Sequence, residues 1–386
     1  MINKQLINLS SPASSGGGTG NQEEGLILHL DANDVDSYDG DGTEWVDITN
    51  HEYTPATNVS EHFNTVLYTG NSGVKTVTGV GFTPDLVWIK NRDGAFNHLL
   101  RDTVRGNDSV ILPNEITAEG TTTGSFNFLD DGFRLPIASS GANNSSYDYV
   151  AWCFKAGGAA VSNTDGTITS QVSVNNDLGF SIVEYTGNLS SSTTATGQSV
   201  GHGLDVAPEL IIFKSTSNAT SWDVFSSELD NWSTRLQLNT NGSKSDYYAQ
   251  YPMANPTGSV FYTNYLSAVN VNNYNYIAYC FASKRGVSKV GSYTGNGSTN
   301  GPKIYTGFEP AFLMFKCTSG SSNWIIVDNK RATSNPRTPH LRANSNSQDD
   351  PGANEYVDFL SDGFQPKGVS NYNNNSNNQT YIYYAV

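Results

Sequence analysis

The fold is decided by an apolar stretch that the chain uses three times: Pro84–Lys90 (PDLVWIK), Pro208–Lys214 (PELIIFK) and Pro310–Lys316 (PAFLMFK). Each stretch begins with proline, contains a run of four or five apolar residues and ends with lysine. A run of this length is typical of a buried strand. Proline is tolerated at the start of a strand, because its missing N–H costs least there. We therefore expect three equivalent strands.

Two further segments recur around each stretch. A turn with the sequence Tyr-Thr-Gly-Asn precedes it, at Tyr68–Asn71, Tyr185–Asn188 and Tyr293–Asn296. An aromatic segment follows it, at Tyr149–Phe154, Tyr276–Phe281 and Tyr381–Val386. The turns are 185 − 68 = 117 and 293 − 185 = 108 residues apart. A unit of that size with many short strands predicts a two-layer sandwich, because solenoid repeats are only about 20–50 residues long.

These repeats predict an all-β protein of three tandem, degenerate antiparallel β-sandwich modules, at residues 63–158, 159–287 and 288–386. We expect residues 1–24 to form an extended N-terminal arm that ends in a Gly/Ser spacer, and residues 25–62 to form a connector or a lectin-like fragment. Gly, Ser, Thr and Asn between short apolar runs favour strands joined by turns.

The net charge of −15, from 36 acidic and 21 basic residues, argues against nucleic acid as a partner, since a phosphate backbone would be repelled. The sequence contains no run of 18 apolar residues, so we do not expect membrane insertion. The N-terminus lacks the apolar core of a signal peptide. We therefore expect the chain to be made and folded in the cytoplasm. The odd number of cysteines, three, predicts no disulfide.

Some polar features recur in two modules only. Phe128–Phe133 matches Phe359–Phe364, and an Asp-Gly pair in each predicts a hairpin turn. Asp102 and Arg105 match Asp328 and Arg331, which we interpret as structural ion pairs.

The most specific segments, Gly81–Arg92, Tyr276–Phe281 and Gly291–Thr299, resemble a repeat module of virion proteins in tailed phages of aquatic bacteria. The resemblance covers residues 63–386. It implies a structural protein of a tail fibre or another virion surface element, and a homo-oligomer, with a trimer favoured. Residues 25–48 are similar to the opening of a laminin-G or concanavalin-like lectin domain, but the rest of such a domain is missing.

The N-terminal arm carries a short apolar piece before the Gly/Ser spacer. We hypothesise that this piece anchors the chain to another virion protein of the capsid or tail, through Ile2, Leu6, Ile7 and Leu9. The alternative is an ordinary frayed terminus.

Catalytic chemistry is not expected. The six histidines are scattered without the spacing of a metal-binding pair, and the candidate carboxylates lie in Asp-Gly turns. No cofactor is predicted except Ca²⁺ in an acidic loop, because hard oxygen ligands suit that ion. The candidate ligands are Asp34, Asp36, Asp39, Asp41 and Glu44. The alternative is a solvated acidic loop.

Three tryptophans, Trp222, Trp232 and Trp324, are candidates for stacking on a glycan of the host surface. The alternative is packing in the core. The first functional hypothesis is a virion appendage that contributes to host attachment through a surface glycan or protein. The second is an architectural protein that decorates the capsid or bridges tail parts without a host ligand. The third is a secreted adhesin or a polysaccharide depolymerase.

Overall fold

The described part of the chain is built almost entirely from antiparallel strands. This computed structural model describes residues 58–122, 126–136, 141–191, 197–246, 253–351, 356–368 and 374–386. Within these ranges the helical content is one 3₁₀ turn, η1 (Val59–Glu61), and each ladder between named strands is antiparallel. The all-β prediction is confirmed. In the same ranges we find no helix that is long and apolar enough to cross a bilayer.

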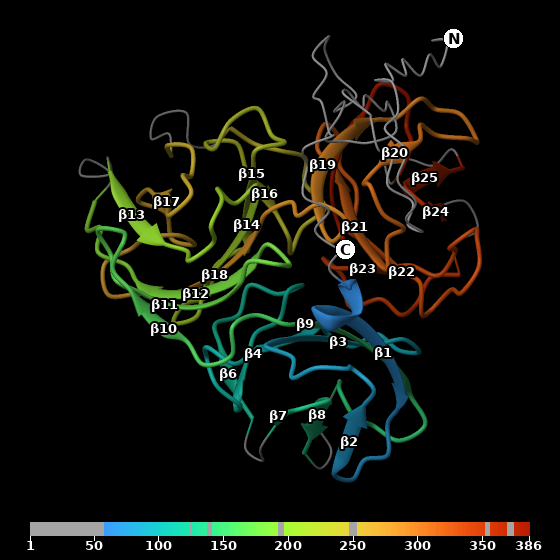
Figure 1. The fold of residues 1–386 in the computed structure, drawn as a ribbon, viewed down its shortest axis with the longest axis horizontal. Coiled ribbons are helices and arrows are strands. Elements are labelled where there is room, and N and C mark those ends of the chain that lie inside the picture. Colours follow the sequence, from blue (N-terminus) through green and yellow to red (C-terminus); the bar gives the residue numbers. More distant parts are fainter. Residues whose placement is uncertain are drawn as a thin grey trace, which may run out of the picture. The chain divides into compact units, whose positions relative to one another are not determined.

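Three large sheets, which Figure 1 shows, share the same order over four strands. Module 1 has β1 (Phe63–Thr69), β9 (Asp148–Phe154), β3 (Leu86–Asn91) and β4 (Leu99–Asp102). Module 2 has β12 (Phe180–Thr186), β18 (Asn275–Phe281), β14 (Leu210–Ser215), β15 (Asp223–Ser226) and β16 (Leu236–Gln237), and adds β10 (Val161–Asn163) and β11 (Ser170–Asn175) beside β12. Module 3 has β19 (Lys289–Thr294), β26 (Thr380–Ala385), β21 (Phe312–Cys317), β22 (Ile325–Asp328) and β23 (Leu341–Arg342). The repeated segments of the sequence therefore occupy equivalent strands.

A smaller sheet covers one face of each large sheet. These sheets contain β2 (Lys75–Thr78), β8 (Gly132–Leu135) and β7 (Asn127–Leu129) in module 1, β13 (Gln198–Gly201) and β17 (Val260–Thr263) in module 2, and β20 (Ile304–Tyr305), β25 (Gly363–Lys367) and β24 (Tyr356–Leu360) in module 3. The remaining pair is β5 (Ser109–Val110) with β6 (Gly120–Thr121). Each module is a sandwich with its own apolar core. The hairpins β7–β8 and β24–β25 turn at the predicted Asp-Gly sites.

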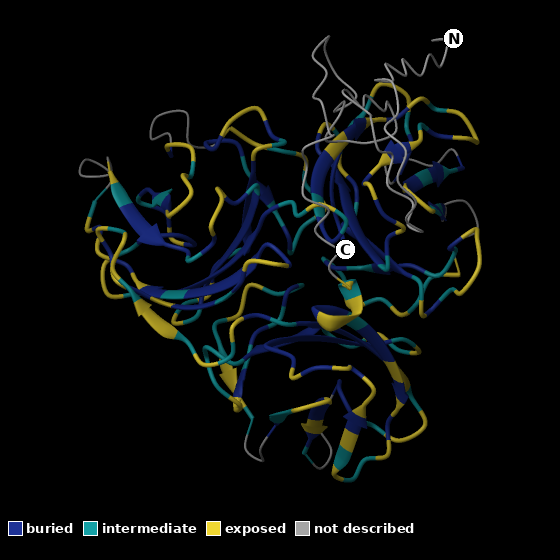
Figure 2. Cartoon of the chain, in the orientation of Figure 1, coloured by how far each residue is buried: buried dark blue, intermediate teal, exposed yellow. Residues whose placement is uncertain are grey.

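The second face of each large sheet is buried too. Alternate side chains of β3 point to opposite faces of the sheet. Val87 and Ile89 lie in the core of module 1, whereas Leu86 and Trp88 lie in a core to which all three modules contribute. Figure 2 shows the resulting burial of the large sheets. Residues Thr57–Val386 accordingly form one compact unit. The tandem modules of the sequence are thus joined around a common apolar centre.

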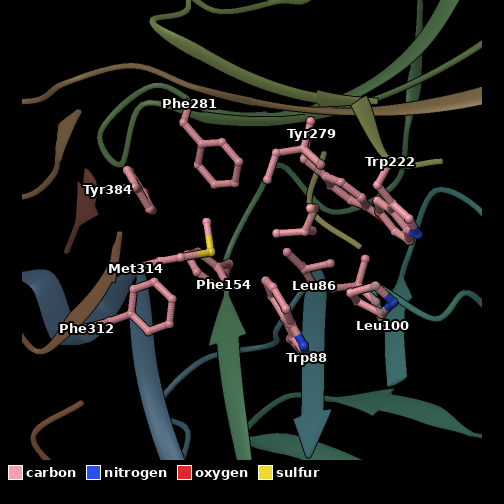
Figure 3. A pocket seen from close by; sticks show the side chains of 13 residues that line it. Leu86, Trp88, Leu100, Phe154, Trp222, Tyr279, Phe281, Phe312, Met314 and Tyr384 are labelled. Atoms are coloured by element: carbon pink, nitrogen blue, oxygen red, sulfur yellow. The ribbon is translucent and has the colours of Figure 1, made fainter. Parts of the chain in front are cut away.

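A small cavity lies in this common core (Figure 3). Its volume is about 20 Å³ and its lining is apolar. Trp88, Ile212 and Met314, which occupy equivalent positions on β3, β14 and β21, all line it. Ile212 has a smaller side chain than Trp88, which occupies the equivalent position in module 1. An apolar cavity of this kind stays dry.

Filling the cavity is expected to stabilise the protein. The Ile212→Phe variant should gain about 0.5–1.5 kcal/mol in free energy of unfolding, because the larger ring occupies empty apolar space. Ile211→Phe is the matched control, since Ile211 faces the filled core of module 2 and its enlargement should cost about 1–3 kcal/mol. Urea unfolding measures both, and a destabilised Ile212→Phe variant would contradict the expectation.

Candidate functional site

The Tyr-Thr-Gly-Asn turn is held in the same way in every module. Its tyrosine stacks on the first aromatic residue of the closing strand, with ring centroids 5.0, 5.4 and 4.8 Å apart in Tyr68–Tyr149, Tyr185–Tyr276 and Tyr293–Tyr381. The hydroxyl of the same tyrosine donates a buried hydrogen bond to a loop carbonyl, at Ala142, Val269 and Asn374 respectively. We call this arrangement the tyrosine clasp.

The clasp also explains the glycine and the asparagine of the motif. A Cβ added to Gly70, Gly187 or Gly295 would overlap a backbone carbonyl oxygen of the neighbouring loop. The backbone N–H of the motif asparagine donates to the side chain of a buried asparagine, which is Asn143, Asn270 or Asn375. The motif is therefore accounted for by the fold of each module.

The lysines that end the apolar strands lie fully inside the protein. Lys90, Lys214 and Lys316 are 0% exposed. Their Nζ atoms donate mainly to backbone carbonyls: Lys214 to Ile116 at 3.1 Å and Thr220 at 2.7 Å, Lys316 to Cys317 at 2.9 Å. Burial lowers the pKa of each of the three lysines to about 8.

The modules meet at three joints that repeat one pattern. We name them the first joint (module 1 with module 2), the second joint (module 2 with module 3) and the third joint (module 3 with module 1). An equivalent backbone hydrogen bond of 2.8 Å crosses each: Glu119 N–H to Thr216 O, Lys244 N–H to Thr318 O, and Asp349 N–H to Arg92 O. The second joint has a further backbone bond, from Ser322 N–H to Asn241 O at 2.9 Å. Because each module donates one such bond and accepts one, the joints form a closed ring.

A ring nitrogen also crosses each joint. Trp222 Nε1 donates to Leu112 O at the first joint, and Trp324 Nε1 donates to Gln237 O at the second. His98 takes the equivalent place at the third joint, with its Nε2 3.1 Å from Arg342 O. Trp88 Nε1 donates to His98 Nδ1, so Nε2 carries the proton and donates. Burial lowers the pKa of His98 to about 3, which keeps it neutral.

Buried ion pairs lie within modules 1 and 3, beside the first and third joints. Arg105 binds Asp102 at 2.7 Å and Glu119 at 2.9 Å, and Arg331 binds Asp328 and Asp349, each at 2.6 Å. The predicted structural ion pairs are confirmed. Burial has the largest single effect and would raise the pKa of Asp328. The charge of Arg331, together with hydrogen bonds from Arg331 and Trp152, outweighs burial, and the pKa lies below its ordinary value.

The structure corrects the prediction of glycan stacking. Trp222 and Trp324 are each 1% exposed and Trp232 is 6% exposed, so none offers a ring face to a sugar. Two of these indoles instead place their N–H on the backbone of the next module. Packing in the core, the alternative reading, describes all three.

The other predicted site residues lie outside the described residues. These are the anchoring residues Ile2, Leu6, Ile7 and Leu9 and the calcium candidates Asp34, Asp36, Asp39, Asp41 and Glu44. In the ranges that are described, we find no group of three or more His, Cys, Asp or Glu side chains placed to hold a metal ion. The three cysteines are free and buried.

The sequence interpretation did not identify the joints. One signal was the lysine that closes each apolar stretch, because a buried ammonium group needs acceptors from other segments. Lys214 donates to Ile116 O and Lys316 to Asn241 O, both in a neighbouring module. Ring nitrogens at His98, Trp222 and Trp324 share one position before β4, β15 and β22, but a histidine in place of tryptophan hid the match.

Comparison with known proteins places the chain in a family. A family model described as Domain of unknown function (DUF7483) matches residues 58–386. The chain belongs to this family. The match runs through all three modules without interruption, in agreement with the shared core and the closed ring of joints. No curated protein and no solved structure matches the chain.

The glycine of the clasp is expected to resist substitution. Gly187→Ala should cost about 1–3 kcal/mol of unfolding free energy, because its Cβ would overlap the carbonyl oxygen of Val271. Gly242→Ala is the control, since its nearest contact is Thr240 Oγ1 at 3.6 Å, and it should change stability by less than about 0.5 kcal/mol. Thermal unfolding of both variants checks this, and equal effects would count against the clasp.

The buried lysines predict that stability rises with pH above about 8. Below that pH the folded chain bears the cost of burying three charges. Between about 8 and 10.5 the folded lysines have lost their protons and the unfolded ones have not, so the unfolded state binds more protons. Each lysine should then add about 1 kcal/mol between about pH 7.5 and about pH 9.

The measurement compares urea unfolding of the wild type and Lys214→Met at both pH values. The variant should lack about a third of the gain, whereas Lys303→Met, at an exposed lysine, should keep it. Burial raises the thiol pKa of Cys153 and Cys280, which opposes the gain, but this effect cancels between variant and wild type. An unchanged pH profile in Lys214→Met would refute the assignment.

Proposed function

We propose that this protein is a non-enzymatic structural component of a tailed-phage virion, placed on the virion surface in a fibre or appendage that contributes to host attachment. One observation carries the structural part of the proposal. The polar residues that recur among the modules make internal contacts: the tyrosine clasp, the buried lysines and the ion pairs beside the joints. Such residues serve to stabilise the fold of the modules.

The resemblance of residues 63–386 to repeat modules of virion proteins supports the location. The negative net charge of −15 suits a protein that must stay soluble at high copy number. On this proposal the N-terminal arm binds another capsid or tail protein, and host contact is spread over loops at the outer ends of the modules. Loops are the segments in which binding residues gather on a rigid scaffold.

The closed ring of joints favours a second candidate, an architectural protein that decorates the capsid or bridges tail parts with no host ligand. Each large sheet is already covered on both faces within one chain, so this unit needs no second copy to bury its core. The homo-oligomer remains part of the first proposal, and its contacts would then involve other surfaces.

Immunogold labelling of intact phage particles tests the proposal. Antibodies against the full chain should label the tail or a fibre, and the purified chain should compete with phage for adsorption to host cells. Labelling over the whole capsid without competition would favour decoration instead. Particles free of the label, or release of reducing sugars when the chain meets host polysaccharide, would overturn the proposal. Removal of residues 1–10 should abolish incorporation into particles.

A further inference from the structure

The three joints share a backbone bond and a ring nitrogen, but they differ in their buried charges. At the first joint the hydroxyl of Tyr279, on β18, donates to Asp102 of module 1 at 2.7 Å. At the third joint Nε1 of Trp152, on β9, donates to Asp328 of module 3 at 3.0 Å. In both places the acceptor is a carboxylate that an arginine of its own module already binds.

The third joint has further charged contacts across the module boundary. Arg92 of module 1 binds Asp349 of module 3 at 2.8 Å, and the Arg331 guanidinium lies over the Trp152 ring at 5.5 Å. The bonds to Asp102, Asp328 and Asp349 across the first and third joints are charge-assisted, and their partners are largely withdrawn from water. Bonds of this kind are the strong ones.

The second joint lacks the equivalent charges. In module 2, Ser226 at the end of β15 occupies the position equivalent to Asp102 and Asp328. Leu229 occupies the position equivalent to Arg105 and Arg331. The Ser226 hydroxyl donates to Glu209 O inside its own module. Tyr384, on β26, stands where Tyr279 and Trp152 stand, but its buried hydroxyl has no hydrogen-bond partner among the described residues. A buried hydroxyl without a partner is costly, because it has lost its hydrogen bond to water.

We propose that the ring of modules opens first at the second joint, between module 2 and module 3. This joint keeps the backbone bond from Ser322 to Asn241 and a 3.4 Å contact from the Lys316 ammonium group to Asn241 O. Its closure, however, gives β26 no bond to a carboxylate and buries the Tyr384 hydroxyl without a partner. The first and third joints gain such a bond. The difference makes separation of modules 2 and 3 the least costly opening of the unit.

This opening has a defined structural result. Phe281 of module 2 and Tyr384 of module 3 have ring centroids 4.6 Å apart, and both line the central cavity. Separation of the two rings would uncover an apolar part of the common core while each module keeps its own core. The fold therefore contains a place at which it can present apolar surface without unfolding. This inference is independent of the proposed function.

Hydrogen exchange of the full chain, read at single amides by mass spectrometry, tests the proposal. The amides of Glu119, Lys244 and Asp349 are matched reporters, because each makes a backbone bond of 2.8 Å across one joint. Opening at the second joint predicts about tenfold less protection for Lys244 than for the other two. Equal protection of all three, or least protection at Glu119 or Asp349, would overturn the proposal.

Two conservative variants separate the joint from general stability. Tyr384→Phe removes the unpaired hydroxyl and should raise the protection of the Lys244 amide about threefold to tenfold. Tyr279→Phe removes the bond to Asp102 and should lower the protection of the Glu119 amide about tenfold, with no effect at Lys244. Loss of protection at Lys244 in Tyr384→Phe, or the same change at all three amides in either variant, would refute the inference.

Discussion

The central constraint is that each large sheet has two apolar faces, and both must be withdrawn from water. The smaller sheet of a module covers one face. The second face carries Trp88 in module 1, Ile212 in module 2 and Met314 in module 3, and it is covered by the other two modules. Burial of apolar surface is the main favourable term in folding, so the three modules close on one another within one chain. The shared core, the cavity and the joints all follow from this closure.

Closure also explains the unusual polar interior. Near the junctions between modules, each apolar strand has a buried lysine as its last residue but one. A buried ammonium group is costly unless it is hydrogen-bonded, and backbone carbonyls at Asn91, Thr220 and Cys317 supply the bonds. Carboxylates near the same junctions are neutralised by Arg105 and Arg331. In module 2, Ser226 and Leu229 replace this pair, and Tyr384 has no carboxylate acceptor at the second joint.

Much of the fold could be predicted because its signals are local. The apolar run at Pro84–Lys90, the turn at Tyr68–Asn71 and the aromatic run at Tyr149–Phe154 each occupy a few consecutive residues, and each became the expected strand or turn. The role of the tryptophans could not be predicted in this way. An indole that is buried and an indole that is open to a sugar have the same local pattern, and Trp222 is placed by Leu112, 110 residues earlier in the chain.

The sequence by itself determined an all-β chain of three equivalent modules, because strand length, turn chemistry and repetition depend on neighbouring residues. Tertiary structure alone decided that the modules share a core and meet at three unequal joints. Alternating apolar positions show that a strand has two buried faces, but they do not show what covers the second. That choice depends on contacts between segments far apart in the chain, such as Tyr279 with Asp102 and Trp152 with Asp328.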